Sequence, residues 1–156
     1  MHKKNGLLNE TEELVLCNDS CFGPVFPFSE MFAKMTENSA DFWGLSNYDV
    51  HYHIQSFFLI LNKRAFKSSA FHNFITSVQK ENGFWNVVLK YEIGLSDVLL
   101  QAGFHSASVL PGKLEEMKKY SKHYHCYNKT FFPILLMEKY HFPLIKVKVF
   151  TAIAVI

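Results

Sequence analysis

Cysteine, glycine and long apolar runs are scarce in this chain, and each scarcity excludes a class of protein. Three cysteines among 156 residues are too few for a disulfide-stapled scaffold, and the odd number favours reduced thiols. Seven glycines and the lack of heptads exclude collagen-like and coiled-coil chains. The apolar run over 149–156 contains Thr151 and is too short to cross a bilayer. Residues 1–6 are mostly charged or polar, so we expect no signal peptide and a cytoplasmic location.

Several well-known site motifs are also missing from the sequence. It contains no phosphate loop of the form GxxxxGK[ST], no GxGxxG and no GxSxG nucleophile elbow. Cys17 and Cys21 could be combined with His123, His125 and Cys126 into a zinc site, but this spacing fits no standard pattern. We therefore do not expect zinc.

Apolar and aromatic residues are abundant, and the charge is unevenly distributed. The chain is 49% hydrophobic and 16% aromatic, which suits one domain with a packed core. Residues 1–112 carry 8 Lys/Arg and 11 Asp/Glu, giving −3, whereas residues 113–156 carry 8 and 3, giving +5. We expect a body at 1–112 and a basic, aromatic-rich extension at 113–156. The extension suits an anionic membrane surface or a solvated helix flank, and the acidic body argues against nucleic acid.

Strand-like and helix-like segments alternate along the chain. Apolar and β-branched runs predict a buried strand over 13–17 and further strands over 41–45, 51–61 and 104–110, with a last one after Pro143. Apolar stripes at helical spacing predict helices after a Ser29 cap, over 65–78, across 91–102 up to Gly103, and over 133–140. This alternation is typical of an α/β layered fold.

Five sequence blocks carry a family resemblance. They are LCNDSCFGPVFPFSEMFAKM (16–35), DFWGLS (41–46), HIQSFFLILNKRAFKSSAF (53–71), KYEIGLSDVLLQAGF (90–104) and HFPLIKVKVF (141–150). In this order and spacing they resemble the rhamnan synthesis protein F family, whose members act in bacterial cell-surface polysaccharide and lipopolysaccharide assembly. The resemblance implies a GT-A-like glycosyltransferase sheet flanked by helices. It also implies transfer of a sugar such as rhamnose from a nucleotide-sugar, dTDP-rhamnose, to a glycan or lipid-linked glycan acceptor at the inner face of the membrane.

A GT-A enzyme places its nucleotide-binding half before its metal motif. Here 17 residues precede Asn18, so the resemblance implies the acceptor-side part of the domain, without a half of about 100 residues. We therefore expect an upstream nucleotide-binding half as a partner. The alternative is a non-catalytic remnant or a glycan-binding module of a split glycosyltransferase.

The resemblance also assigns a metal and a base. Asn18, Asp19 and Ser20 stand where GT-A enzymes carry Asp-x-Asp, and Asp19 with its neighbours could hold Mg²⁺ or Mn²⁺ against the donor phosphates. An Asx turn is the alternative for this tripeptide. Glu92, beside Tyr91 at the start of a predicted helix, is the candidate base that accepts the acceptor proton. A carboxylate in a first helical turn can equally complement the helix dipole.

Two further pairs are candidates for binding donor or acceptor. His53 and Gln55 alternate along the predicted strand, so both should point to one face. They could hold a sugar or a phosphate oxygen, or form a satisfied structural pair, since buried polar groups must be bonded. Asp41 and Trp43 likewise share a face, an arrangement suited to stacking on a sugar ring, although Trp43 could equally belong to the core.

Overall fold

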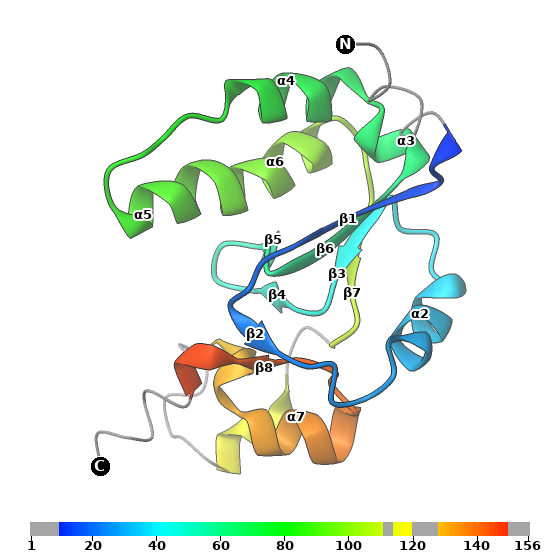
Figure 1. Ribbon diagram of the computed structural model, residues 1–156, viewed down its shortest axis with the longest axis vertical. Helices are drawn as coiled ribbons and strands as arrows, with labels where there is room; N and C mark the ends of the chain where they lie inside the picture. Colours follow the sequence, from blue (N-terminus) through cyan, green and yellow to red (C-terminus); the bar gives the residue numbers. More distant parts are fainter. Residues whose placement is uncertain (1–9, 111–113, 120–127, 150–156) are drawn as a thin grey trace.

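The computed structural model describes residues 10–110, 114–119 and 128–149. This part of the chain contains a four-stranded sheet of order β1-β6-β3-β7 (Figure 1). Its strands are β1 at Glu13–Cys17, β6 at Phe58–Asn62, β3 at Phe42–Gly44 and β7 at Ser106–Ser108. β6 runs antiparallel to both of its neighbours and β3 runs parallel to β7, so the sheet is mixed.

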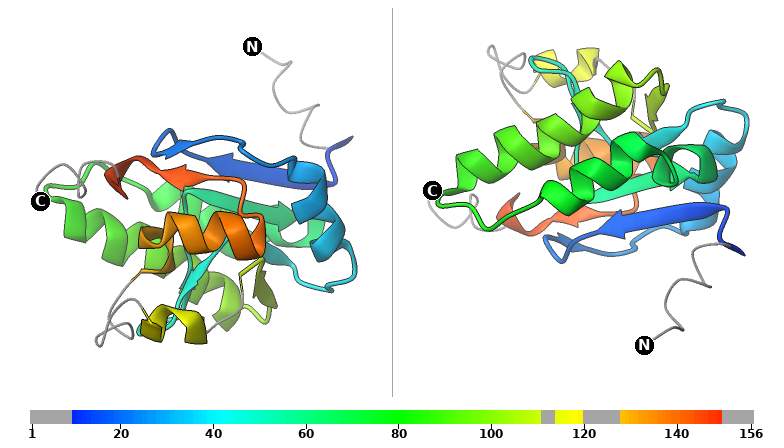
Figure 2. Two further views of the ribbon diagram at one scale, coloured as in Figure 1. Left: turned by 90° about the horizontal axis from the view of Figure 1, so that it is seen from below. Right: turned by 90° about the horizontal axis from the view of Figure 1, so that it is seen from above.

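Two short antiparallel pairs accompany the sheet. They join β2, Cys21–Phe22, to β8, Ile145–Lys146, and β4, Asn47–Tyr48, to β5, His53–Ile54. Figure 2 shows β8 alongside β2, so segments from opposite ends of the sequence lie together.

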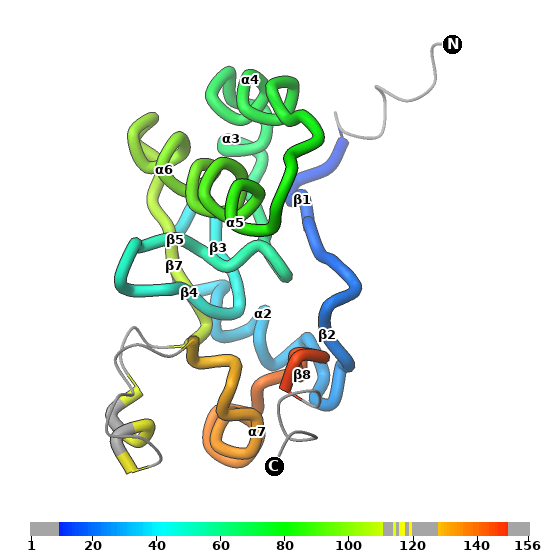
Figure 3. Tube along the Cα trace, turned by 90° about the vertical axis from the view of Figure 1, so that its left-hand side faces the viewer, coloured from blue at the N-terminus to red at the C-terminus, as the bar shows by residue number. Residues whose placement is uncertain are grey.

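Helices lie on both sides of the main sheet (Figure 3). On one side are α3, Lys63–Phe66, and α4, Ser69–Ser77, with a continuous helical stretch of α5, Phe84–Val87, the π-helical η1, Val88–Ile93, and α6, Gly94–Gln101. On the other side are α2, Phe28–Thr36, and α7, Pro133–Tyr140. The short 3₁₀ segments are η2, Glu115–Lys119, and η4, Lys129–Phe131.

Successive side chains of the central strands point alternately into two apolar cores, one on each side of the sheet. Along β6, Phe58 and Ile60 belong to the core shared with α2 and α7, whereas Leu59 and Leu61 belong to the core under α3, α4 and α6. Successive side chains of a strand point to opposite faces, so a strand covered on both sides is apolar throughout. The molecule is thus a layered α/β structure, as the sequence predicts.

Several sequence-based element predictions are confirmed and others need correction. The helix over 133–140 and the strand within 41–45 are present. β1 is present, but it is an edge strand whose residues alternate between half-buried and exposed, so the prediction of a buried strand was wrong. The helix expected over 65–78 is split, because Ser68 caps a new helix by accepting a hydrogen bond from the Phe71 N–H. Ser29 lies inside α2, whose N-cap is Pro27.

The long strand expected over 51–61 is also divided. Ile54 pairs with Asn47 in the β4–β5 hairpin, and the next residues carry the chain across to β6, which joins the main sheet. The apolar pattern of the segment fits both parts, so it gave no sign of the break.

The C-terminal segment packs against the body. Apolar residues on both sides of residue 112 share one core, including Met31, Trp43, Leu114, Leu136 and Phe142. The domain boundary expected at residue 112 stays a prediction. The described residues before and after it pack into the same apolar core. No helix in the described ranges is long and apolar enough to span a bilayer.

Candidate active site around Glu92

The Glu92 carboxylate lies at the meeting point of η1, β5 and the turn before β6. Its Oε1 is 3.2 Å from His53 Nε2, and its Oε2 accepts hydrogen bonds from the Ser56 backbone N–H at 3.1 Å and from the Ser56 hydroxyl at 2.5 Å. The side chain keeps 22% of its surface exposed. The carboxylate is therefore fixed in place, and the side chain is not fully buried.

The local helix geometry differs from the sequence-based expectation. Glu92 was expected in a first helical turn, but the helical stretch begins at Phe84, so the dipole explanation does not apply. A π-helical segment is rare and often occurs at functional sites. Here it carries Glu92 toward β5.

His53 forms a pair with Glu92. Its Nδ1 lies 2.6 Å from the His51 carbonyl oxygen, which can only accept, so Nδ1 carries a proton. Burial opposes the charged imidazolium, but the hydrogen bonds to Glu92 and His51 outweigh it and raise the pKa of His53 above its usual value. Burial likewise opposes ionisation of Glu92, but its bonds to His53 and Ser56 lower its pKa. Both directions favour an ion pair.

Ser56 was missed by the sequence-based reasoning. The signal was present, because Ser56 follows the two polar residues already singled out in the HIQS segment. On a continuous strand it would have pointed away from His53. The break after β5 lets its backbone N–H and hydroxyl turn to Glu92.

Gln55 has a different set of partners from His53. Its Oε1 accepts a 2.5 Å hydrogen bond from the Ser46 hydroxyl, and its N–H donates to the Ser46 carbonyl at 3.0 Å. Both side chains are buried. Gln55 thus matches the structural alternative, whereas His53 belongs to the Glu92 cluster.

Asp41 ties three segments together. Arg64 donates to both carboxylate oxygens, Asn62 donates to Oδ1 at 3.1 Å, and the His105 N–H donates to Oδ2 at 2.9 Å. The hydrogen bond from Arg64 is the largest cause that holds the pKa of Asp41 far below its usual range. This carboxylate is already fully engaged within the fold.

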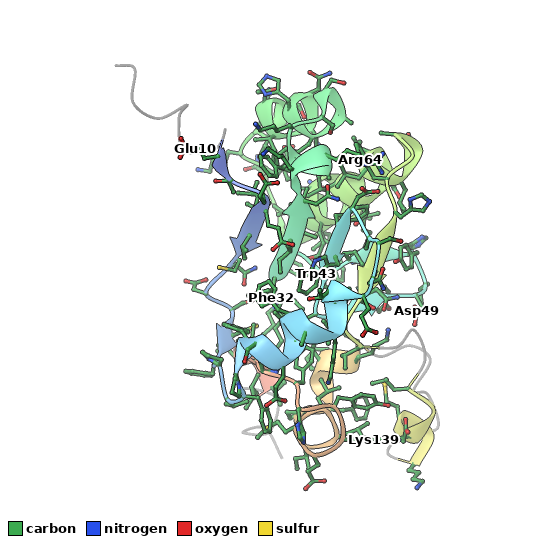
Figure 4. The ribbon with its side chains drawn as sticks, turned by 90° about the vertical axis from the view of Figure 1, so that its right-hand side faces the viewer. Glu10, Phe32, Trp43, Asp49, Arg64 and Lys139 are labelled. Carbon is green, nitrogen blue, oxygen red and sulfur yellow. The ribbon has the colours of Figure 1, made fainter. Side chains whose placement is uncertain are left out.

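Trp43 and Tyr91 also have structural contacts. The Trp43 side chain is only 6% exposed and packs edge-on against Phe32 at 5.5 Å between ring centroids, a contact between β3 and α2 seen in Figure 4. The Tyr91 hydroxyl bonds to the backbone of Gln79 and to Glu81. The Tyr91 hydroxyl therefore holds the connection before α5. Their predicted roles in sugar binding gain no support from these contacts.

The Asn18–Ser20 loop reaches the same region from the other side. Asn18 Oδ1 accepts from the Ser20 N–H at 3.0 Å and from its hydroxyl at 2.5 Å, which is an Asx turn. The Asn18 N–H donates to the Phe57 carbonyl at 3.3 Å. Phe57 follows Ser56, so this loop and the Glu92 cluster are attached to adjacent residues.

Lys146 on β8 connects the two groups. Its ammonium donates to the Ser20 hydroxyl at 2.8 Å and lies 4.0 Å from the centroid of the Phe57 ring. Its charge and that of Glu92 also attract each other. The structure thus brings together Asn18, Ser20, His53 and Glu92 with Ser56 and Lys146, and leaves Asp41, Trp43, Gln55 and Tyr91 in other contacts.

Comparison with known families identifies the chain. The model for rhamnan synthesis protein F matches residues 5–155. The chain belongs to the rhamnan synthesis protein F family. This membership confirms the resemblance and connects the chain with polysaccharide biosynthesis. No curated protein and no solved structure matches the chain.

The metal ion expected from a GT-A-like member of this family can be tested against the residues at Asn18–Ser20. Two of the three side chains, those of Asn18 and Ser20, are hydrogen-bonded to each other, and the Ser20 oxygen also accepts a hydrogen bond from the Lys146 ammonium. Asp19 is exposed and is the one carboxylate of the loop. Divalent cations prefer several carboxylate or carbonyl oxygens, and a neighbouring ammonium repels them. No group of three metal-ligating side chains occurs among the described residues. This donor set does not fit Mg²⁺ or Mn²⁺.

Proposed function

We propose that the chain is the acceptor-side part of a GT-A-like glycosyltransferase of rhamnan synthesis. It would transfer a sugar such as rhamnose from a nucleotide-sugar to a hydroxyl group of a glycan or lipid-linked glycan. The observation that carries the proposal is the Glu92 carboxylate, which His53 and Ser56 fix and keep ionised while part of it stays exposed. An ionised, accessible carboxylate is the form that a general base requires.

Glu92 would accept the proton of the acceptor hydroxyl. The hydroxyl oxygen forms its new bond to the anomeric carbon as the bond to the diphosphate breaks, and this makes its proton progressively more acidic. A carboxylate of lowered pKa can therefore take the proton late in the step. The His53 imidazolium would hold the carboxylate in position and keep it charged before the acceptor arrives.

The proposal includes an upstream nucleotide-binding half as a partner. In this arrangement the other half would grip the base and ribose, and the described chain would contribute the base and the acceptor side. The alternative, a glycan-binding module without catalysis, is favoured by one observation. The Asn18 and Ser20 oxygens, expected to face a metal, are bonded to each other instead.

Turnover of the donor discriminates between the two functions. The full chain, alone and with an upstream half, is incubated with dTDP-rhamnose and acceptor glycan, with and without Mg²⁺, and released dTDP is measured. We expect turnover that Glu92→Gln reduces by about 10²-fold or more, the size of a general-base contribution. Glu81→Gln is the matched control, because Glu81 also pairs with a cation, Lys90, but lies in the connection before α5. Glycan binding without any donor turnover would support the binding module and contradict the enzyme.

We further propose a peripheral position at an anionic membrane. Of the basic residues after 112, Lys129 is buried against Asn47 and Asp49, and Lys139 pairs with Glu116. Lys148 is exposed and lies 4.5 Å from the ring centroid of the exposed Phe84. Exposed aromatic rings beside lysines are typical of membrane-surface contacts.

Co-sedimentation with vesicles containing anionic lipid tests this position. Binding should weaken as salt rises and should fall in Lys148→Gln. Lys63→Gln, which removes a half-exposed charge on α3, should leave binding unchanged. Binding that does not respond to salt would contradict an electrostatic contact.

A further inference from the structure

Lys146 is half-buried, and in the part of the chain that the structure describes it forms no salt bridge. Lys63, Lys90, Lys129 and Lys139 each form a salt bridge with a carboxylate. Among the described residues, no carboxylate forms a salt bridge with Lys146, and its contacts are the Ser20 hydroxyl and the face of the Phe57 ring. Burying a charge without a paired anion costs stability, so the fold alone gives no reason for this arrangement.

The neighbours of Lys146 do not neutralise it. Its pairing partner across the β2–β8 ladder is Cys21, and burial raises the pKa of that thiol, so the thiol is uncharged at neutral pH. Glu92 attracts Lys146, but among the described residues the cation that forms a salt bridge with Glu92 is His53. A half-buried ammonium beside a hydroxyl and a backbone turn can therefore accept an anion.

We propose that Lys146 and Ser20 bind the diphosphate of the nucleotide-sugar donor, in place of a divalent metal ion. This inference rests on the proposed function and adds the group that stabilises the leaving diphosphate. The inference also explains why the Asn18–Ser20 loop fits a metal ion poorly. The Lys146 ammonium lies beside the Ser20 oxygen, where the metal ion was expected.

Lys146 and Glu92 would act on different groups in the reaction: Lys146 on the leaving diphosphate and Glu92 on the acceptor hydroxyl. The bond from the anomeric carbon to the diphosphate oxygen breaks, and its electron pair stays on that oxygen, where the Lys146 ammonium compensates the added negative charge. The acceptor oxygen forms the new bond to the anomeric carbon and its proton passes to Glu92. Phe57 and Ser56 are adjacent in the chain, so the groups that contact Lys146 and Glu92 belong to one turn.

Binding of the leaving group in the presence of a chelator tests the inference. Calorimetric titration of the full chain with dTDP in excess EDTA should give measurable affinity. Lys146→Met should raise the dissociation constant at least about tenfold, the loss expected for one charge-assisted contact, and Lys146→Arg should keep it within about threefold. Lys63→Met, which removes a half-exposed lysine on α3, is the matched control and should leave the dissociation constant unchanged.

Competition with other ligands shows whether the site recognises the phosphate groups of dTDP or its nucleoside. Inorganic pyrophosphate should compete with dTDP, whereas thymidine should not, because the proposed contacts are to phosphate oxygens. Competition by thymidine alone would contradict the assignment. Thermal unfolding of Lys146→Met and Ser20→Ala should stay cooperative. If Lys146→Met does not fold, Ser20→Ala still decides, with an expected rise of about threefold in the dissociation constant.

The outcomes also separate this inference from the proposed function. Donor turnover that requires Mg²⁺ and is unaffected in Lys146→Met would overturn the role of Lys146 and leave the glycosyltransferase proposal standing. Failure to bind dTDP with or without Mg²⁺, in the presence of the upstream half, would overturn both.

Discussion

The Asp41 carboxylate shows how one side chain can hold three segments of the fold together. It joins the residue before β3 to Arg64 on α3, to Asn62 at the end of β6 and to the backbone before β7. Charge-assisted hydrogen bonds to a buried carboxylate are among the stronger polar interactions in proteins. We therefore assign Asp41 to stability.

Replacing Asp41 should destabilise the protein in a pH-dependent way. Asp41→Asn should lower the free energy of unfolding at neutral pH by about 2 kcal/mol, because hydrogen bonds to a charged group are lost. Since the folded-state pKa lies below the unfolded value of about 4, this contribution is present above that pH and disappears as the pH falls below it. Urea unfolding of both proteins at several pH values measures the difference. A difference that does not narrow in acid would contradict this explanation.

The His53–Glu92 pair makes a second prediction at the residue scale. The His53 pKa in the folded protein is raised, so the pair stabilises the fold below the unfolded pKa of about 6.5 and loses this effect as the pH rises through the folded value. NMR titration of the imidazole should give a pKa above about 6.5 in the native protein. In Glu92→Gln it should fall, because burial then outweighs the remaining bond to His51. Glu81→Gln should leave the titration unchanged.

At the scale of elements, the candidate site depends on the break between β5 and β6, which the apolar pattern of the sequence did not indicate. The segment from His53 to Phe58 has the composition of one strand, yet it leaves β5 and turns before it enters β6. Ile54 pairs with Asn47 in the β4–β5 hairpin and so lies outside β6. Strand pairing of this kind depends on the whole fold and not on the local sequence. Candidate residues such as Glu92 and His53 could be identified from their chemistry, but the contribution of Ser56 required the turn.

Gly44 on β3 has a packing requirement that can be tested by a pair of glycine replacements. A Cβ at this position would overlap Ile54 Cγ2 and would approach the Phe58 carbonyl oxygen to 2.8 Å. Because a central strand cannot move away easily, Gly44→Ala should cost about 2 kcal/mol or more of stability. Gly94→Ala is the control: its Cβ would meet ordinary contacts of 3.5 Å and beyond, and in a helix it should gain up to about 1 kcal/mol. Equal thermal stability of the two variants would contradict the packing argument.

The capping residue of α4 gives a smaller expected effect. The Ser68 hydroxyl accepts from the Phe71 N–H at 3.1 Å and so begins a new helix after α3. Ser68→Ala should lower the free energy of unfolding by about 1 kcal/mol, whereas Ser68→Asp should largely preserve it, because aspartate is also a good N-cap. Chemical denaturation of the two variants measures this. A larger loss in Ser68→Asp than in Ser68→Ala would show that the cap does not act in this way.

For the whole molecule, the candidate site draws on distant parts of the sequence. Ser20 near one end of the described chain and Lys146 near the other meet because β2 pairs with β8. The sequence indicated the α/β class, the family and several of the residues. It could not indicate this meeting, because both strands are only two residues long and carry no strong pattern. Composition could show that the C-terminal segment is basic, but not that its Lys146 contacts Ser20.

The central claim is that Glu92, His53, Ser56 and Lys146 belong to one active site, with Lys146 at the donor diphosphate and Glu92 at the acceptor hydroxyl beside it. It is tested most directly by titrating the ¹⁵N-labelled full chain with dTDP-rhamnose, together with an upstream half where one is needed, and following the backbone amide signals. We predict that the largest shifts fall on Ser20, Ser56, Glu92 and Lys146, and that Gly94 and Arg64 respond less. Shifts centred instead on Asp41 and Trp43, or no shifts at saturating donor, would contradict the account.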